Sequence, residues 1–232
     1  MSDLDIAPIS APPAQTATDQ IFRTLYDAVV SLKLPPGTKV SEIDIARQLN
    51  VSRQPVRDAF FRLSKLGFIA IRPQRATLIT KISERAVLDA AFVRTALEVE
   101  CLRVALETAG RSEIARLRDN LARQRASIGG VDPSVFHAQD EEFHATLCDI
   151  AGQPHAWSLI QEQKAQMDRV RWLTLTEERQ TSVHAEHTAI VDAMERGDPK
   201  AAERQLRSHL GDIRNALVRI RDAHGAYFET SA

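Results

Sequence analysis

Apolar side chains recur every three or four residues along most of the chain, which predicts a protein built mainly from helices. The first such stretch begins near Asp19 and ends at residues 35–37, Pro-Pro-Gly, because proline and glycine stop helices. A short helix over residues 41–49 follows, and Asn50 supplies the turn before a helix that begins at Ser52. Two capped helices joined by so short a turn predict a helix-turn-helix, whose second helix can enter the major groove of DNA.

The pattern changes after Gly67, where two β-prone runs replace the helical spacing. Residues 68–72 and 77–80 form these runs, and Pro-Gln-Arg-Ala at 73–76 joins them, which is typical of a β-hairpin. A hairpin directly after a DNA-reading helix is a wing. The sequence therefore predicts a winged helix-turn-helix domain over residues 18–80, preceded by a flexible tail over residues 1–17.

Helical spacing then returns and continues to the C-terminus without a strand pattern. Asp-Pro at 132–133 and 198–199 are strong helix starts, because proline is accepted at the first helical position. Residues 81–232 are therefore predicted to form an all-α bundle, and the fold class is mainly α. The six predicted helices cover residues 83–109, 112–128, 133–151, 154–175, 182–196 and 199–224.

Charge is divided unevenly between the two predicted domains. The whole chain has a net charge of -1, but residues 18–80 contain ten Lys+Arg and five Asp+Glu, which leaves -6 for the rest. A basic head joined to an acidic body is typical of a DNA-binding module that carries a second domain. Two cysteines, no apolar run long enough for a bilayer and no signal peptide pattern predict a cytoplasmic protein.

Arg53 and Arg57 stand four residues apart, so both project from the first turns of the helix that would enter the groove. An arginine can bind guanine through two hydrogen bonds, although two arginines on a helix can also be plain solvated charges. The hairpin that follows favours the interpretation that these arginines contact DNA, because Arg72 and Arg75 would then lie beside phosphates. The predicted DNA-binding residues are Ser52, Arg53, Gln54, Arg57, Arg72 and Arg75.

A second group of residues has the composition of a metal site. Asp140 and His144 lie one turn apart on a predicted helix, and His187 and His209 lie on apolar faces of two later helices. If they converge, one carboxylate and three imidazoles would hold a divalent transition metal and leave positions for water or a ligand oxygen. Single histidines on apolar faces are more often hydrogen-bonded core residues, and Asp140 with His144 can be an ion pair. Zinc is the first choice of metal, and nickel, manganese and iron suit the same donors.

Taken together, these motifs resemble the FadR subfamily of GntR-family bacterial transcription regulators. The first domain matches in Pro36-Gly37, the 41–49 helix, Val51-Ser-Arg-Gln-Pro-Val-Arg57 and the run from Leu66-Gly67 to Arg72-Pro73. The resemblance implies that residues matching Ser52, Arg53 and Arg57 touch DNA and that the wing reaches the minor groove. Ala76 departs from the expected glycine at the wing, and Ile43 stands where some members carry a DNA-contacting arginine.

The second domain resembles the FCD effector domain, in its six-helix VanR-like branch. The matching signatures are Asp140-Glu-Glu-Phe-His144, Glu186-His-Thr-Ala-Ile190 and Leu206-Arg-Ser-His-Leu210. In metal-binding members the residues matching Asp140, His144, His187 and His209 are the ligands.

Effector recognition is expected beside this metal. Arg94 matches an arginine that commonly contacts the effector carboxylate in FCD domains, although it can equally pair with Glu98 one turn on. Arg169 and Trp172 are expected to line the same cavity, with core packing as the alternative for Trp172. A metal and an arginine together favour a small organic acid, such as a sugar acid or a hydroxy acid.

These expectations describe a homodimeric repressor, not an enzyme, that releases double-stranded DNA when its acid binds. Two subunits would read a two-fold symmetric operator. Two alternatives use the same residues: a repressor that senses the metal itself, and a metalloenzyme with Glu141, Glu142 or Glu186 as base.

Overall fold

Two of the three helices of the N-terminal domain begin at a side chain that caps them. In this computed structural model, which describes residues 16–71 and 76–230, Thr16 and Ser41 accept hydrogen bonds from the first turns of two helices. Asn50 ends the second of these in the left-handed conformation, with φ 53°, and so makes the turn of the helix-turn-helix. The domain comprises α1 (Ala17–Val30), β1 (Lys39–Val40), α2 (Glu42–Leu49), α3 (Arg53–Lys65), β2 (Ile69–Ala70) and β3 (Thr77–Ile79).

The wing is a three-stranded antiparallel sheet in the order β1-β3-β2. Ile69 pairs with Ile79 across the hairpin, and Lys39 pairs with Leu78 on its other edge. The β1 strand is absent from the sequence prediction, because two residues are too few to show an alternating pattern. Residues 72–75, at the tip of the hairpin, lie outside the described part of the chain.

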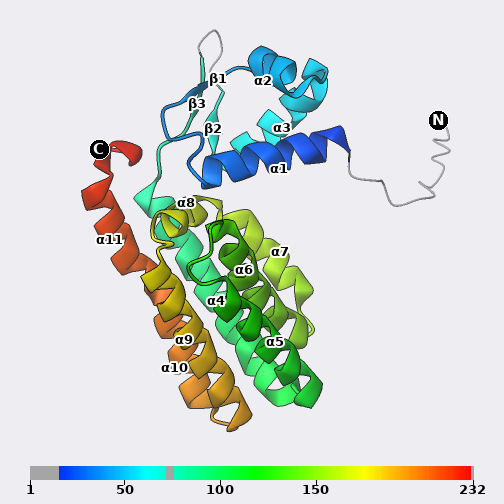
Figure 1. Ribbon diagram of the computed structural model, residues 1–232, viewed down its shortest axis with the longest axis vertical. Helices are drawn as coiled ribbons and strands as arrows, with labels where there is room; N and C mark the ends of the chain where they lie inside the picture. The colour runs from blue at the N-terminus through cyan, green and yellow to red at the C-terminus, as the bar shows by residue number, and fades with distance from the viewer. Residues whose placement is uncertain (1–15, 72–75, 231–232) are drawn as a thin grey trace, which may run out of the picture.

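The rest of the described chain is helical and forms an elongated bundle below the winged domain (Figure 1). Long α4 runs through it and packs against α6, α7, α8 and α10. None of the described helices is long and apolar enough to cross a membrane. The helices are α4 (Glu84–Thr108), α5 (Arg111–Ser127), α6 (Pro133–Ile150), α7 (Pro154–Gln163), α8 (Ala165–Leu173), α9 (Glu177–Glu195), α10 (Pro199–Gly211) and α11 (Ile213–Ala223), followed by a 3-10 turn η1 (Gly225–Tyr227).

The mainly α fold class is confirmed, but three predicted helix boundaries are wrong. The predicted helix over 154–175 breaks at Lys164, a residue with no helix-breaking tendency that is buried among carboxylates. The predicted helix over 199–224 breaks after Gly211, where glycine weakens the helix. The helix predicted to start at 182 starts at Glu177, because Thr176 caps it. Tertiary contacts and a missed cap explain the differences.

Helix α8 lies where the two domains meet, as Figure 1 shows. Its Ala165 belongs to the apolar core of the winged domain, whereas Met167 and Val170 pack with α11 in a separate apolar cluster. That cluster also contains Ile82, which pairs with Phe228 near the C-terminus. The winged domain therefore rests on the bundle through side chains of one short helix.

Candidate metal centre and DNA-binding surface

Three helices bring the four predicted metal ligands to one point inside the bundle. Asp140 and His144 come from α6, His187 from α9 and His209 from α10. All four are buried, and one candidate ligand atom from each lies within 4.8 Å of all the others. The convergence that the sequence motifs predict is present in the structure.

The histidine rings face one another through their Nε2 atoms. His209 Nε2 lies 3.2 Å from His144 Nε2 and 3.2 Å from His187 Nε2. Asp140 Oδ1 lies 3.8 Å from His187 Nε2 and is a buried oxygen with no hydrogen-bond partner among the described residues. Four acceptor-capable atoms thus surround one small volume.

The other ring nitrogen of each histidine is hydrogen-bonded outward. His144 Nδ1 lies 2.6 Å from Glu98 Oε2, and His209 Nδ1 lies 2.5 Å from Glu186 Oε2. His187 Nδ1 lies 3.0 Å from Gln124 Oε1. Because an oxygen acceptor requires a proton on Nδ1, all three neutral rings turn unprotonated Nε2 lone pairs toward the centre.

Electrostatics favour the same protonation states. Burial lowers the pKa of His187 well below its usual value, and the adjacent His209 and His144 rings lower it further. Burial alone would raise the pKa of Asp140, but Arg171 and the nearby imidazoles hold it well below its usual value. For Asp140 and His187 these shifts favour an ionised carboxylate and a neutral imidazole, the forms that metal ligands need.

A divalent metal ion fits this set of side chains. Two imidazole nitrogens on one ion lie about 3 Å apart, since each bond is about 2.0–2.1 Å long. Lone pairs that face one another at this spacing repel unless a cation or a proton lies between them, and Asp140 Oδ1 needs a partner for the same reason. Asp140, His144, His187 and His209 would hold the ion, which would polarise an oxygen ligand bound to it.

A small cavity of about 50 Å³ opens beside this cluster and is lined by Arg94, Arg171 and Arg179 together with Asp140 and His209. Most of the arginine charge is already paired. Arg171 contacts Asp140 and Glu141, and Arg179 lies 2.7 Å from Glu186. The cavity is therefore less cationic than its arginine content implies.

Arg94 makes the ion pair that was the alternative to effector binding, yet keeps one donor free. Its Nε donates to Glu98 Oε1 at 2.5 Å, and both side chains are buried. Its Nη2 is a buried nitrogen with no hydrogen-bond partner in the described structure. Because Nη2 carries two N–H donors and one of them points away from the direction of the Nε–H bond, the pair with Glu98 and contact with a ligand are compatible.

The structure does not bring Arg169 or Trp172 into this cavity. Arg169 is fully buried at the domain boundary, where Nη1 donates to the Thr80 carbonyl at 2.7 Å. The Trp172 ring is half-buried and packs edge-on against His137. Both residues lie on α8, but Met167 and Arg171 are the residues of that helix that line the cavity.

Four of the predicted DNA-binding residues lie on the outer part of the winged domain. Arg53 and Arg57 are on the first turns of α3, and more than half of each side chain is exposed. Both lie near Glu42 Oε2 of α2, at 3.7 Å and 3.4 Å. Gln54 donates to Asp58 at 2.9 Å, and the Ser52 hydroxyl makes no capping bond. These four side chains share one exposed end of α3, as direct reading of DNA requires.

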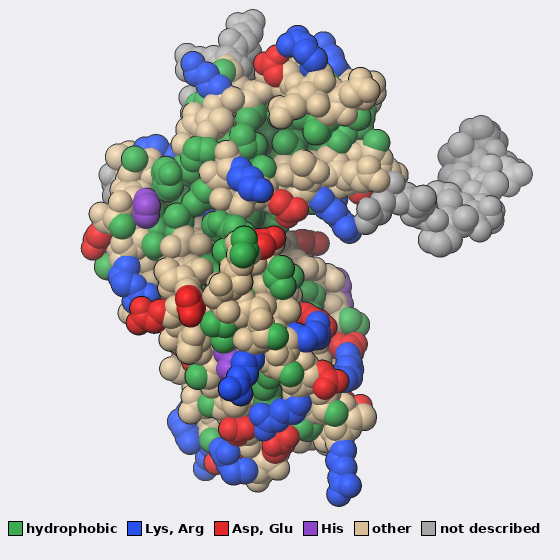
Figure 2. All heavy atoms as spheres, in the orientation of Figure 1, with side chains coloured by type: hydrophobic (Ala, Val, Ile, Leu, Met, Phe, Trp, Pro, Cys, Tyr) green, Lys and Arg blue, Asp and Glu red, His purple; other side chains and the backbone are tan. Residues whose placement is uncertain are grey.

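Lys and Arg side chains lie at the outer end of the winged domain in the space-filling view, whereas the visible bundle surface mixes both signs (Figure 2). Arg72 and Arg75, the two predicted phosphate contacts of the wing, lie outside the described residues.

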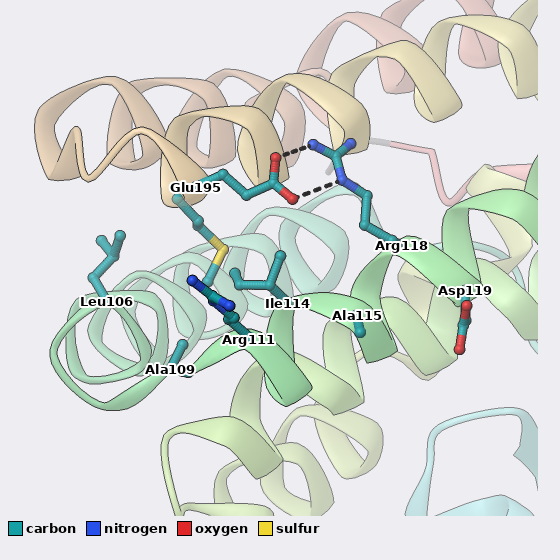
Figure 3. Close-up of a pocket in the computed structure, with 10 residues that line it drawn as sticks. Leu106, Ala109, Arg111, Ile114, Ala115, Arg118, Asp119 and Glu195 are labelled. Carbon is teal, nitrogen blue, oxygen red and sulfur yellow. Dashed lines mark hydrogen bonds and ion pairs between the residues drawn. The ribbon is translucent and has the colours of Figure 1, made fainter.

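A wide groove at the far end of the bundle has a volume of about 670 Å³ (Figure 3). It lies between the end of α4, the start of α5 and the end of α9. Arg118 on its wall is held by Glu195 at 2.6 Å and by Asp192 at 2.6 Å. With this charge already neutralised and no buried polar group directed into it, the groove lacks the chemistry of the metal cluster.

Sequence reasoning missed the residues that orient the cluster. Glu98 and Gln124 come from α4 and α5, and Arg171 comes from α8. Arg94 and Glu98 at i and i+4 gave a local signal, but the roles of Gln124 and Arg171 depend on contacts between distant segments. Glu186 was considered only as a base or a surface charge.

The fold, the exposed arginines of α3 and the buried cluster together define a DNA-binding transcription regulator rather than an enzyme, and sequence comparison agrees. Residues 17–79 match the bacterial regulatory proteins of the gntR family, and residues 89–212 match the FCD domain. The chain therefore belongs to the GntR family of bacterial regulatory proteins and carries an FCD domain.

Individual relatives support this assignment. The chain is 35% identical over 217 residues to the HTH-type transcriptional repressor RspR of Escherichia coli K12, covering 93% of this chain and 95% of RspR. It is 27% identical to a probable D-xylose utilization operon transcriptional repressor of Paenarthrobacter nicotinovorans, covering 84% of this chain and 86% of that protein. The solved structure of E. coli McbR/YncC has the same fold, with a TM-score of 0.72 at 16% identity over 90% of this chain and 99% of that structure.

Proposed function

We propose that this protein is a metal-dependent repressor that leaves its operator when a small organic acid binds beside the ion. The observation that carries the proposal is the orientation of the three histidines, each with Nδ1 held by an outer acceptor and Nε2 directed inward. Structural core histidines do not need this arrangement, whereas metal ligands do. Zinc is the metal we propose first, and nickel, manganese or iron would suit the same donors.

A carboxylate is the effector group that the free donor beside the cluster supports. Arg94 Nη2 is the buried nitrogen without a partner, and it belongs to the cavity that adjoins the ligands. A hydroxy acid or sugar acid could place one oxygen on the ion and one on this nitrogen. The small volume favours short acids or an accompanying movement of the helices. Arg169 and Trp172 are left out of the proposed contacts because both lie elsewhere.

Binding to a two-fold symmetric operator requires two copies of the chain, and α4 offers a self-complementary face. Phe92 is 71% exposed on this helix. If two copies pair antiparallel about the middle of α4, Arg85 of one faces Glu107 of the other, and Asp89 faces Arg103. The exposed Ala96 then lies at the two-fold axis, Phe92 of each copy lies against Glu100 of the other, and opposite charges meet on both sides, as a two-fold interface requires.

Metal and operator binding test the main proposal. Purified full-length protein, stripped with a chelator, is titrated with Zn²⁺ by calorimetry, and its affinity for its own promoter DNA is measured by fluorescence anisotropy. A thermal-shift screen of sugar acids and hydroxy acids, with and without Zn²⁺, then identifies the effector. Failure to bind any of the four metals would reject metal dependence, and a screen without a metal-dependent hit would reject the acid.

The dimer has its own test by light scattering. Phe92→Glu buries a charge at the proposed contact and should give the monomer mass, whereas Val135→Glu, at an exposed site on α6, should not change the mass. A dimer that survives Phe92→Glu would place the interface elsewhere.

A repressor that senses the metal itself is the second candidate. The observation in its favour is that the cavity is small and that Arg171 and Arg179 are already paired with carboxylates. In that case Zn²⁺ alone changes operator affinity at concentrations near its own dissociation constant, and no acid changes it further.

A further inference from the structure

A chain of buried ion pairs leads from the metal cluster to the DNA-binding domain. On the bundle side this chain of ion pairs contains Lys164, Asp168 and Arg171. Lys164 immediately precedes α8, and Asp168 and Arg171 lie on that helix, four and seven positions further along. This spacing places them on one face of the helix, toward α6. All three side chains are at least four-fifths buried.

The first link joins a metal ligand to α8. Asp140 uses its two oxygens differently: Oδ1 faces the histidines without a hydrogen-bond partner, and Oδ2 accepts from Arg171. Arg171 Nη1 also donates to Glu141 Oε1 at 2.6 Å. One guanidinium thus spans a ligand and its sequence neighbour, so a change in the position or charge of Asp140 acts directly on Arg171.

The second link crosses to the winged domain. Lys164 Nζ lies 2.6 Å from Glu141 Oε2 and 2.5 Å from Asp168 Oδ2. The hydroxyl of Tyr26, on α1, donates to the same Asp168 oxygen at 3.1 Å. Tyr26 is separated from Asp168 by 142 positions in sequence, and its ring packs against Phe22 and Phe68 within the winged domain.

Side chains on the opposite face of α8 donate hydrogen bonds to main-chain carbonyl oxygens of the winged domain. Gln166 Nε2 donates to the Gly67 carbonyl at 2.9 Å, and Arg169 Nη1 donates to the Thr80 carbonyl. A rotation or shift of α8 would therefore change the positions of α3 and the wing relative to the bundle, because Gly67 follows α3 and Thr80 follows β3.

We propose that the chain Asp140–Arg171–Glu141–Lys164–Asp168–Tyr26 transmits occupancy of the ion site to the DNA-binding domain by moving α8. This inference rests on the proposed metal site and adds the route by which that site acts on the operator. Arg171, Lys164 and Tyr26 are positioning residues in this scheme, since none of them contacts DNA or supplies an ion ligand.

Charge balance gives the physical reason. Asp140, Glu141 and Asp168 carry three negative charges, and Lys164 and Arg171 carry two positive ones, so the group is left with one negative charge. A divalent ion at Asp140 Oδ1 reverses the sign of that sum. In a largely buried network such a change alters the preferred positions of the partners, because screening by water is weaker there than at the surface.

A second metal site is the main competing explanation for this cluster. His137, Glu141 and Asp168 also lie close enough to hold an ion. The ammonium group of Lys164, however, already lies between the two carboxylates and supplies the cation. The group therefore acts as a connection between helices, in which a protein cation takes the place of a metal.

Tyr26 allows the route to be observed without DNA. The chain contains two tyrosines, Tyr26 and Tyr227, so fluorotyrosine labelling gives two ¹⁹F signals, which the Tyr26→Phe variant assigns. Adding Zn²⁺ to the stripped protein should shift the Tyr26 signal more than the Tyr227 signal, since Tyr227 packs against the apolar cluster of α8 and α11 and is not a member of the ion-pair chain. Calorimetry on the same sample records whether Zn²⁺ binds. Binding with a stationary Tyr26 signal would overturn the relay alone, whereas no binding would overturn the metal site as well.

Operator affinity tests the consequence. We expect the dissociation constants of Zn²⁺-loaded and stripped wild-type protein for promoter DNA to differ by about 5- to 150-fold. Tyr26→Phe removes one hydroxyl and leaves Lys164 on Asp168, so the protein should fold and bind Zn²⁺ while this ratio falls to within about threefold of one. Tyr227→Phe, the same chemical change away from the relay, should keep the wild-type ratio. Three results would overturn the proposal. They are a wild-type ratio of one, a ratio that Tyr26→Phe leaves unchanged, and an equal decrease of the ratio in both variants.

Discussion

The two functional regions of this regulator are built in opposite ways. At the DNA-binding surface, Arg53 and Arg57 are more than half exposed and share one loosely placed partner, Glu42, at 3.4–3.7 Å. In the metal cluster each histidine is buried and held on its outer side by an acceptor 2.5–3.0 Å away. The surface keeps its side chains free to adapt to DNA, whereas the cluster fixes its donors before a ligand arrives.

This difference predicts that single substitutions should act strongly and locally in the cluster and more weakly on the surface. The largest effect is expected for His187→Ala, which removes an inward Nε2 and should weaken Zn²⁺ binding by more than about 100-fold. Calorimetry against a competing chelator measures it. His184→Ala, three residues earlier on α9 and outside the cluster, is the matched control and should bind Zn²⁺ like the wild type.

Removing an outer partner should have the next largest effect. Gln124→Ala leaves the His187 ring without its Nδ1 partner and should reduce Zn²⁺ affinity by about 10- to 100-fold. Ser127→Ala, which removes a partly buried hydroxyl of α5 that contacts neither a histidine nor the Gln124 side chain, is the comparison. Equal losses in both variants would point to general damage of α5 rather than to orientation of the ring.

On the DNA-binding surface, Arg53→Ala should weaken operator binding by about 5- to 150-fold if the arginine reads a base through two hydrogen bonds. Anisotropy with specific and scrambled duplexes separates base reading from phosphate contact, because loss of a phosphate contact weakens both equally. Arg116→Ala removes the same charge from the bundle helix α5, outside the proposed dimer contact, and should leave affinity for both duplexes unchanged.

The smallest effect is expected at Glu42. Its carboxylate pairs with the two arginines in the free protein and would lie near phosphates in the complex. Glu42→Gln should therefore tighten DNA binding by no more than about fivefold, since exposed ion pairs contribute about 0–1 kcal/mol. Glu203→Gln on α10 controls for net charge. Weaker binding in Glu42→Gln would show that the carboxylate holds the arginines in the reading position.

Sequence reasoning found what local spacing encodes and missed what tertiary packing supplies. The turn at Asn50, the caps and the i, i+4 pairs of Arg53 with Arg57 and Asp140 with His144 are visible within a few residues. Joining Asp140 and His144 to ligands on two later helices also required resemblance to a known domain, because spacing along the chain does not show which distant helices meet.

The errors come from the same cause. Arg169 and Arg171 lie two positions apart on α8, and one enters the cavity while the other faces the winged domain. The rotation of α8 about its axis decides which arginine enters the cavity and which faces the winged domain. That rotation follows from the break at Lys164. No helix-breaking residue at Lys164 signals the break, and the ammonium group of Lys164 is buried between Glu141 of α6 and Asp168 of α8.

The contacts that Gln166 and Arg169 make with the winged domain are directed to carbonyl oxygens, which every amino acid carries. Substitutions at the positions that supply those oxygens therefore leave the joint chemically intact. A head with different operator preference could be grafted onto this bundle and still be held by the same two side chains. This type of contact would allow different winged domains to be combined with the same helical bundle.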